Sequence, residues 1–215
     1  MTALVETPRN RDLGQVWTPE DIALSMARKA LGALPGVRFV LDPACGPGTF
    51  SRALAEAGGK GLHVDAYDVD PVMAERTAAV NREAGLAGTV ACRDYLLEEG
   101  LAGRYDLVIM NPPYIRQELL DAKKKDLYHA RIRSALPGER PDRRSNLFAL
   151  FLLKAASDLR PGGVLCAIVY DADGLPFVLS NWHVLQGPEG EIGDKVIQPG
   201  AFDGGLVEND VIGTL

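Results

Sequence analysis

The amino-acid sequence predicts an α/β fold with a mostly parallel sheet and helices on both faces. Apolar runs of strand length alternate along the chain with segments whose apolar residues recur at helical spacing. Strands and helices that alternate in this way form a parallel sheet. The expected strands are residues 37–41, 62–67, 89–92, 105–110 and 163–169, and the expected helices are residues 19–34, 51–56, 72–84 and 146–158.

The expected helices have recognisable boundaries. In the first, apolar Ile22, Met26 and Ala30 recur at helical spacing, Thr18 is the expected N-cap and Pro19 occupies the first turn. The second and third helices each follow a strand and a turn, DPACGPG and DVDP. The fourth, which contains FALFLLKAASD, is the most apolar and precedes the last strand.

Size and composition indicate a soluble globular protein with a substantial core. The chain has 215 residues, 47% of them hydrophobic and 24% charged, and its net charge is −6. The N-terminus lacks the apolar stretch of a signal peptide, and no apolar run is long enough to span a bilayer. A cytoplasmic protein without membrane contact is therefore expected. The three cysteines lie far apart, so neither a metal site nor a disulfide framework is expected.

The residues at the strand ends predict a ligand site. In an open parallel sheet, ligands bind beyond the carboxyl ends of the strands. The first strand ends in DPACGPGT, where Gly46 and Gly48 allow a tight turn and close backbone approach to a ligand. The second strand ends in Asp68, an acid placed to accept from ribose hydroxyls. The third leads to Asp94, placed to accept from an adenine amine.

This combination favours S-adenosyl-L-methionine as cofactor. The glycine loop has neither the GK[ST] of a P-loop nor the GxGxxG of a dinucleotide site, so a bound polyphosphate is not expected. A ribose acid and an adenine acceptor without a phosphate cradle suit S-adenosylmethionine better than NAD or ATP.

Over residues 12–170 the chain resembles the γ-type DNA adenine-N6 methyltransferases of restriction–modification systems. The segments that carry the resemblance occur in family order: GQVWTPEDIALSMARKAL, DPACGPGTF, AYDVDP, RDYL, NPPY and SNLFALFLLKAASDLRPGGVLCAIV. The resemblance implies the Rossmann-like fold of S-adenosylmethionine-dependent methyltransferases and methyl transfer to the N6 amine of an adenine flipped out of duplex DNA. The implied cofactor-binding residues are Thr18, Pro19, Asp42, Pro43, Ala44, Cys45, Gly46, Gly48, Thr49, Asp68, Asp94 and Asn111.

The fourth strand ends in Asn111, Pro112, Pro113 and Tyr114, the expected catalytic residues. The lone pair of the adenine amine is delocalised into the ring, so the amine is a poor nucleophile. Acceptors at Asn111 Oδ1 and the Pro112 carbonyl would direct that lone pair at the methyl group, and the prolines would hold them rigidly. Tyr114 would stack on the flipped base. The chemistry needs no metal and no covalent nucleophile.

Two alternatives remain at this stage. Glutamine methyltransferases that act on release factors also carry NPPY, and an amide nitrogen poses the same delocalisation problem. A catalytically dead remnant that binds S-adenosylmethionine is the other alternative, because the family normally continues with further strands and a recognition domain. The basic segment from Arg116 to Ser145 is expected to be either a solvated loop or a phosphate-contacting flap.

The composition changes near residue 170, which predicts a methyltransferase domain over 1–170 and a β-rich tail over 171–215. The fold is therefore expected to be truncated after strand five. In the tail, residues 176–205 resemble the segment around the catalytic histidine of trypsin-like serine peptidases, with His183 at that position. The Asp and Ser of a triad are absent, so proteolysis is not expected.

Overall fold

The computed structural model describes residues 18–113, 115, 120–138, 141, 145–170, 176–180, 195–197 and 211–214. The chain divides into two compact units, Met1–Leu179 and Ser180–Leu215. In the second unit, β7 (Lys195–Ile197) and β8 (Val211–Thr214) pair antiparallel. His183 lies outside the described residues. The domain boundary after residue 170 and the peptidase resemblance stay predictions.

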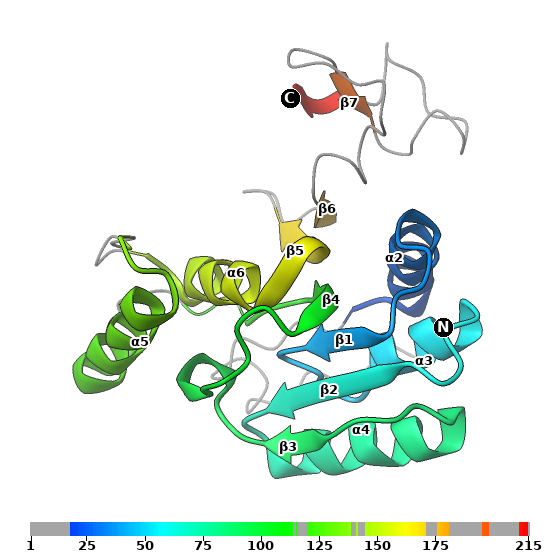
Figure 1. The fold of residues 1–215 in the computed structure, drawn as a ribbon, viewed down its shortest axis with the longest axis horizontal. Helices are drawn as coiled ribbons and strands as arrows, with labels where there is room; N and C mark the ends of the chain where they lie inside the picture. Colours follow the sequence, from blue (N-terminus) through cyan, green and yellow to red (C-terminus); the bar gives the residue numbers. More distant parts are fainter. Residues whose placement is uncertain are drawn as a thin grey trace. The chain divides into compact units, whose positions relative to one another are not determined.

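The first unit alternates strands and helices along the chain (Figure 1). Its strands are β1 (Phe39–Asp42), β2 (His63–Asp68), β3 (Val90–Cys92), β4 (Tyr105–Met110), β5 (Leu159–Tyr170) and β6 (Pro176–Ser180). Its helices are α2 (Glu20–Ala33), α3 (Thr49–Glu56), α4 (Pro71–Ala84), the 3₁₀ turn η1 (Tyr95–Leu97), α5 (Ala122–Ala135) and α6 (Leu147–Asp158).

The strands form one sheet in the order β3-β2-β1-β4-β5-β6. The pairs from β3 to β5 are all parallel, so the predicted mostly parallel sheet is confirmed. The order reverses between β1 and β4, which creates the switch point where such sheets bind ligands. β6 lies beside β5, so a segment after the predicted composition boundary covers the edge of the last predicted strand.

The helices form two groups: α2, α3 and α4 pack in succession, and α5 packs on α6 (Figure 1). Every residue of β4 is buried, as a strand at the centre of a sheet with helices on both faces requires. Two buried acids are paired by tyrosines within this core. Tyr105 donates to Asp65 at 2.9 Å, and Tyr95 donates to Asp158, which Lys154 also contacts at 2.8 Å.

Two predictions about helices are wrong. Pro19, not Thr18, is the N-cap of α2, and no side chain caps this helix. No helix was predicted at α5, because residues 116–145 show no apolar period and were expected to form either a solvated loop or a phosphate-contacting flap. It forms nonetheless, with the Asp121 side chain accepting from the Lys124 amide at 3.0 Å at its N-cap.

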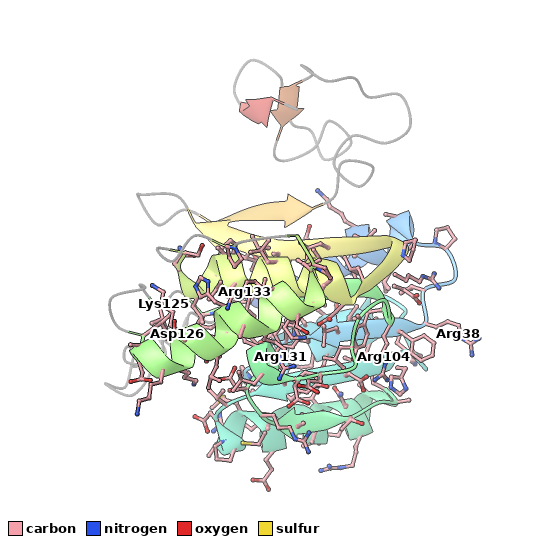
Figure 2. The ribbon with its side chains drawn as sticks, turned by 60° about the vertical axis from the view of Figure 1, so that its left-hand side comes forward. Arg38, Arg104, Lys125, Asp126, Arg131 and Arg133 are labelled. Carbon is pink, nitrogen blue, oxygen red and sulfur yellow. The ribbon has the colours of Figure 1, made fainter. Side chains whose placement is uncertain are left out.

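Helix α5 buries little of its own surface, which explains the missing period. Its buried residues are Tyr128, His129 and Ile132. Figure 2 shows charged side chains along the rest of the helix, and Arg131 forms an ion pair with Glu99. Within the described part of the chain, no helix is long and apolar enough to cross a membrane.

Candidate active site

A cavity lies where the carboxyl ends of β1, β2 and β4 meet η1, α5 and α6. Ten of the predicted site residues line it: Thr18, Pro43, Ala44, Cys45, Gly46, Thr49, Asp68, Asp94, Asn111 and Pro113. The fold therefore brings together residues from five separate parts of the sequence. Tyr114 lies outside the described residues.

Four predicted residues do not line the cavity, each for a physical reason. Pro19 is the N-cap of α2, and Pro112 is buried between the wall residues Asn111 and Pro113 in the sequence. Gly48 begins α3 and faces α4. Asp42 is fully buried beneath the loop. The loop thus contributes to the wall mainly through residues 43–47 and Thr49.

The loop after β1 is held by hydrogen bonds to the end of β2. The Cys45 amide donates to the Tyr67 carbonyl at 2.9 Å, and the Gly46 amide donates to Asp68 Oδ2 at 2.9 Å. Gly46 has a φ of 50°, in the left-handed region that glycine adopts at little cost. The backbone of the loop is therefore fixed against Asp68 before any ligand arrives.

Asp68 is in turn fixed by its own backbone neighbours. Its Oδ1 accepts from the Asp70 amide at 2.9 Å. Burial raises the pKa of Asp68, while the bonds from the Asp70 and Gly46 amides oppose that rise. Each carboxylate oxygen has a second lone pair, so the side chain can still accept from two hydroxyls in the cavity.

Asp42 acts below the cavity. Its Oδ1 accepts from the Ala44 amide at 3.4 Å, and its Oδ2 has no hydrogen-bond partner among the described residues. Burial raises the pKa of Asp42 to about 8, so the neutral acid is the main form at neutral pH. Its place in the structure is a support for the loop rather than a ligand contact.

Asn111 is oriented by a residue from a distant part of the sequence. Its Nδ2 donates to Thr18 Oγ1 at 3.1 Å, over a separation of 93 residues in sequence. Because Nδ2 is the donor in this bond, the acceptor end of the amide, Oδ1, is turned elsewhere. The predicted N-cap residue Thr18 thus positions the amide that ends β4.

Asp94 meets two side chains from helix α5 that the sequence reading missed. Tyr128 donates from its hydroxyl to Asp94 Oδ2 at 2.6 Å, and Lys124 Nζ contacts the same oxygen at 2.9 Å. Asp94 Oδ1 accepts from the Leu96 amide at 3.3 Å, which begins η1. The signal was present in the sequence: Lys124 and Tyr128 are four residues apart and so share one helix face.

The other missed wall residues are mostly apolar: Pro47, Phe50, Val69, Arg93, Tyr95, Ile115, Leu120, Leu147 and Phe151. They come from the loop after β1, the segments after β2, β3 and β4, the turn η1, and helices α3 and α6. Tyr95 and Phe151 pack together with ring centroids 5.4 Å apart. A cavity with apolar walls and a few fixed acids is suited to a ligand with a flat ring and hydroxyl groups.

The cysteine of the loop is not a nucleophile. Burial, with the nearby Asp42 as a smaller contribution, raises the pKa of the Cys45 thiol above its usual value. A thiol with a raised pKa stays protonated and is inert. No cluster of three or more metal-ligating side chains occurs among the described residues.

The parallel sheet, the glycine loop and the strand-end acids define a Rossmann-like fold of the class I methyltransferase type. A solved structure shares it: a protein of Listeria monocytogenes assigned to the class I S-adenosylmethionine-dependent methyltransferases matches with a TM-score of 0.57 and 21% identity. That match covers 75% of this chain and 48% of that one.

Residues 70–172 match the family described as Eco57I restriction-modification methylase. The Type II methyltransferase M.TthHB8I of Thermus thermophilus is 33% identical over 180 residues, which are 78% of this chain and 37% of that protein. The tRNA1(Val) (adenine(37)-N6)-methyltransferase of Klebsiella pneumoniae is 33% identical over 95 residues, covering 41% of this chain and 37% of that protein. The chain thus spans about a third of the length of these relatives. The predicted resemblance to DNA methyltransferases of restriction–modification systems is confirmed.

Proposed function

We propose that the cavity binds S-adenosylmethionine as the methyl donor. Asp68 would accept from the ribose hydroxyls, Asp94 would accept from the adenine amine, and the apolar walls would cover the ring. The loop at residues 43–46 would lie under the methionine part, with Thr18 at its far end. These residues fit the donor because they supply acceptors for its hydroxyls and amine but no cradle for a phosphate.

The acceptor of the methyl group is proposed to be the N6 amine of an adenine. The single observation that carries this proposal is that Asn111 shares one cavity with Asp68 and the glycine loop. Asn111 Oδ1 and the Pro112 carbonyl would each accept from the amine and turn its lone pair towards the sulfonium methyl group. The donor supplies an electrophilic methyl carbon and a good leaving group, so positioning is the main task of the protein.

Duplex DNA is the proposed substrate because the family match and the long alignment are to restriction–modification methyltransferases. The shorter match to a tRNA methyltransferase supports adenine N6 as the reactive atom and makes RNA a second candidate. Phosphate contact by the basic side chains of α5, and base stacking by Tyr114, remain parts of this proposal.

Replacing Asn111 by alanine tests the proposal. We expect the Asn111→Ala variant to lose methyl transfer by at least ~100-fold, because the preorganised acceptor is gone. S-adenosylmethionine should still bind with nearly wild-type affinity, as measured by calorimetry. Transfer is followed with labelled S-adenosylmethionine on duplex DNA, tRNA and a release factor, and the modified atom is identified by mass spectrometry.

Each result has one interpretation. Transfer to DNA that depends on Asn111 supports the proposal, whereas transfer to tRNA or a glutamine amide corrects the substrate. Binding without any transfer by the wild-type chain indicates the cofactor-binding remnant. Activity that survives in Asn111→Ala contradicts the role of Asn111.

A further inference from the structure

Helix α5 fixes the acid at the adenine end of the cavity through two side chains. Both Tyr128 and Lys124 contact Asp94 Oδ2, and both also line the cavity. Lys124 Nζ lies 5.6 Å from the centroid of the Tyr128 ring, so the three side chains form one cluster. Asp94 lies 30 residues before Lys124 in the sequence, so the cluster joins two distant segments.

The distribution of donors leaves one carboxylate oxygen less occupied than the other. Oδ2 receives a short bond from a hydroxyl and an ammonium group. Among the described residues, the one hydrogen bond given to Oδ1 comes from the amide of Leu96, at 3.3 Å. A carboxylate has about four acceptor positions, so Oδ1 keeps capacity for another donor.

We propose that Tyr128 and Lys124 are positioning residues that aim Asp94 Oδ1 into the cavity and thereby select an amine at C6 of the ligand's purine ring. This proposal rests on the proposed function, since it takes the cavity to be the S-adenosylmethionine site. By holding Oδ2, the two side chains restrict rotation of the carboxylate. An amine can donate to an oxygen held in this way, whereas a C6 carbonyl oxygen, which is itself an acceptor, cannot.

The burial of Tyr128 and its raised pKa support a role as a hydrogen-bond donor that keeps its proton. Its side chain is buried, with only 3% of the residue exposed. Burial, and then the bond to Asp94, raise the pKa of Tyr128 above its usual value, so the hydroxyl keeps its proton across the range in which the protein would be assayed. Lys124 is half exposed and adds charge at the rim.

A purely structural role for the cluster would have a different effect on ligand binding. If Tyr128 merely attached α5 to the sheet, loss of its hydroxyl would weaken the binding of every ligand of the cavity equally. If it aims Asp94, the loss would change the preference between ligands that differ only at C6. The preference is therefore the quantity to measure.

The experiment measures dissociation constants of S-adenosylhomocysteine and of its inosine counterpart, which carries a carbonyl oxygen in place of the C6 amine. Calorimetry is performed on the full chain and on Tyr128→Phe and Lys124→Met. Two matched controls are Tyr105→Phe, which removes a buried hydroxyl bonded to Asp65 away from the cavity, and Lys123→Met, which removes an exposed charge from the same helix.

We expect the wild-type chain to prefer the amine ligand by ~100-fold or more, because a site built for a donor rejects an acceptor. The preference should fall by about 10-fold in Tyr128→Phe, by a smaller factor in Lys124→Met, and not at all in the two controls. A preference that is unchanged in both Tyr128→Phe and Lys124→Met overturns the inference. Failure of the wild-type chain to bind S-adenosylhomocysteine instead contradicts the proposed function, so the two failures are distinguishable.

Discussion

Single residues at this site are prepared by their neighbours rather than by a ligand. Asp68 is held by two backbone amides, Asn111 by Thr18, and Asp94 by a tyrosine and a lysine. Such preorganisation reduces the ordering that binding must bring about. Asp42 lies outside the cavity wall and is fully buried, and its burial makes the stability of the fold depend on pH.

The raised pKa of Asp42 predicts that the fold becomes less stable as the pH rises. The folded chain holds the Asp42 proton up to about pH 8, whereas an unfolded chain releases it near pH 4. Between these values the folded state binds more protons, so raising the pH lowers the contribution of Asp42 to stability. We therefore compare the free energy of unfolding of Asp42→Asn with that of wild type. As the pH rises from 5 to 8, this difference should shift by about 2 to 4 kcal/mol in favour of Asp42→Asn.

Urea denaturation of both proteins at pH 5 and pH 8 checks this expectation, because other groups titrate equally in the two chains and cancel. The amide oxygen of asparagine can still accept from Ala44. A difference between the two proteins that stays constant with pH would show that Asp42 is ionised in the fold.

At the scale of elements, the site depends on how closely α3 and α4 approach. Gly48 has a φ of 83° at the start of α3, and a Cβ there would lie 3.2 Å from both Val80 Cβ and Thr77 Oγ1. Thr77 also donates to the Gly46 carbonyl at 2.8 Å. Packing between the two helices is thus coupled directly to the loop that lines the cavity.

Gly48→Ala should therefore destabilise the fold by about 2 to 3 kcal/mol, from an unfavourable φ and from crowding against α4. Gly61→Ala is a matched control, because Gly61 has a φ of 80° and nothing within 4 Å of a Cβ. The control should cost about 1 kcal/mol in thermal or urea unfolding. Equal costs in the two variants would mean that close packing at Gly48 is unimportant.

Most of the helices and strands could be predicted from the sequence, but one helix could not. Apolar runs and glycine turns predicted β1 to β5 and four helices, because those elements bury one face or both. Helix α5 could not be found in this way, since it buries so few side chains that no apolar period appears. Its cap at Asp121 and the spacing of Lys124 and Tyr128 were visible, but their partner Asp94 is contributed by another element.

For the whole molecule, topology explains why so much of the site was predictable. Parallel strands bring their carboxyl ends to one edge, so the residues after β1, β2 and β4 converge without any knowledge of side-chain contacts. Topology does not specify whether a residue at a strand end is buried or lines the cavity. Asp42 and Asp68 are each the last residue of a strand, yet Asp42 is fully buried and does not line the cavity, whereas Asp68 lines it.

The proposed chemistry depends on the binding of S-adenosylmethionine at this edge of the sheet. Calorimetric titration of S-adenosylmethionine onto wild type, Asp68→Ala and the control Asp70→Ala tests it most directly; Asp70 caps α4 and is not among the residues that line the cavity. We predict one site per chain, at least ~10-fold weaker binding in Asp68→Ala and little change in Asp70→Ala. No binding by wild type, or equal affinity in Asp68→Ala, would contradict an S-adenosylmethionine site at this edge of the sheet.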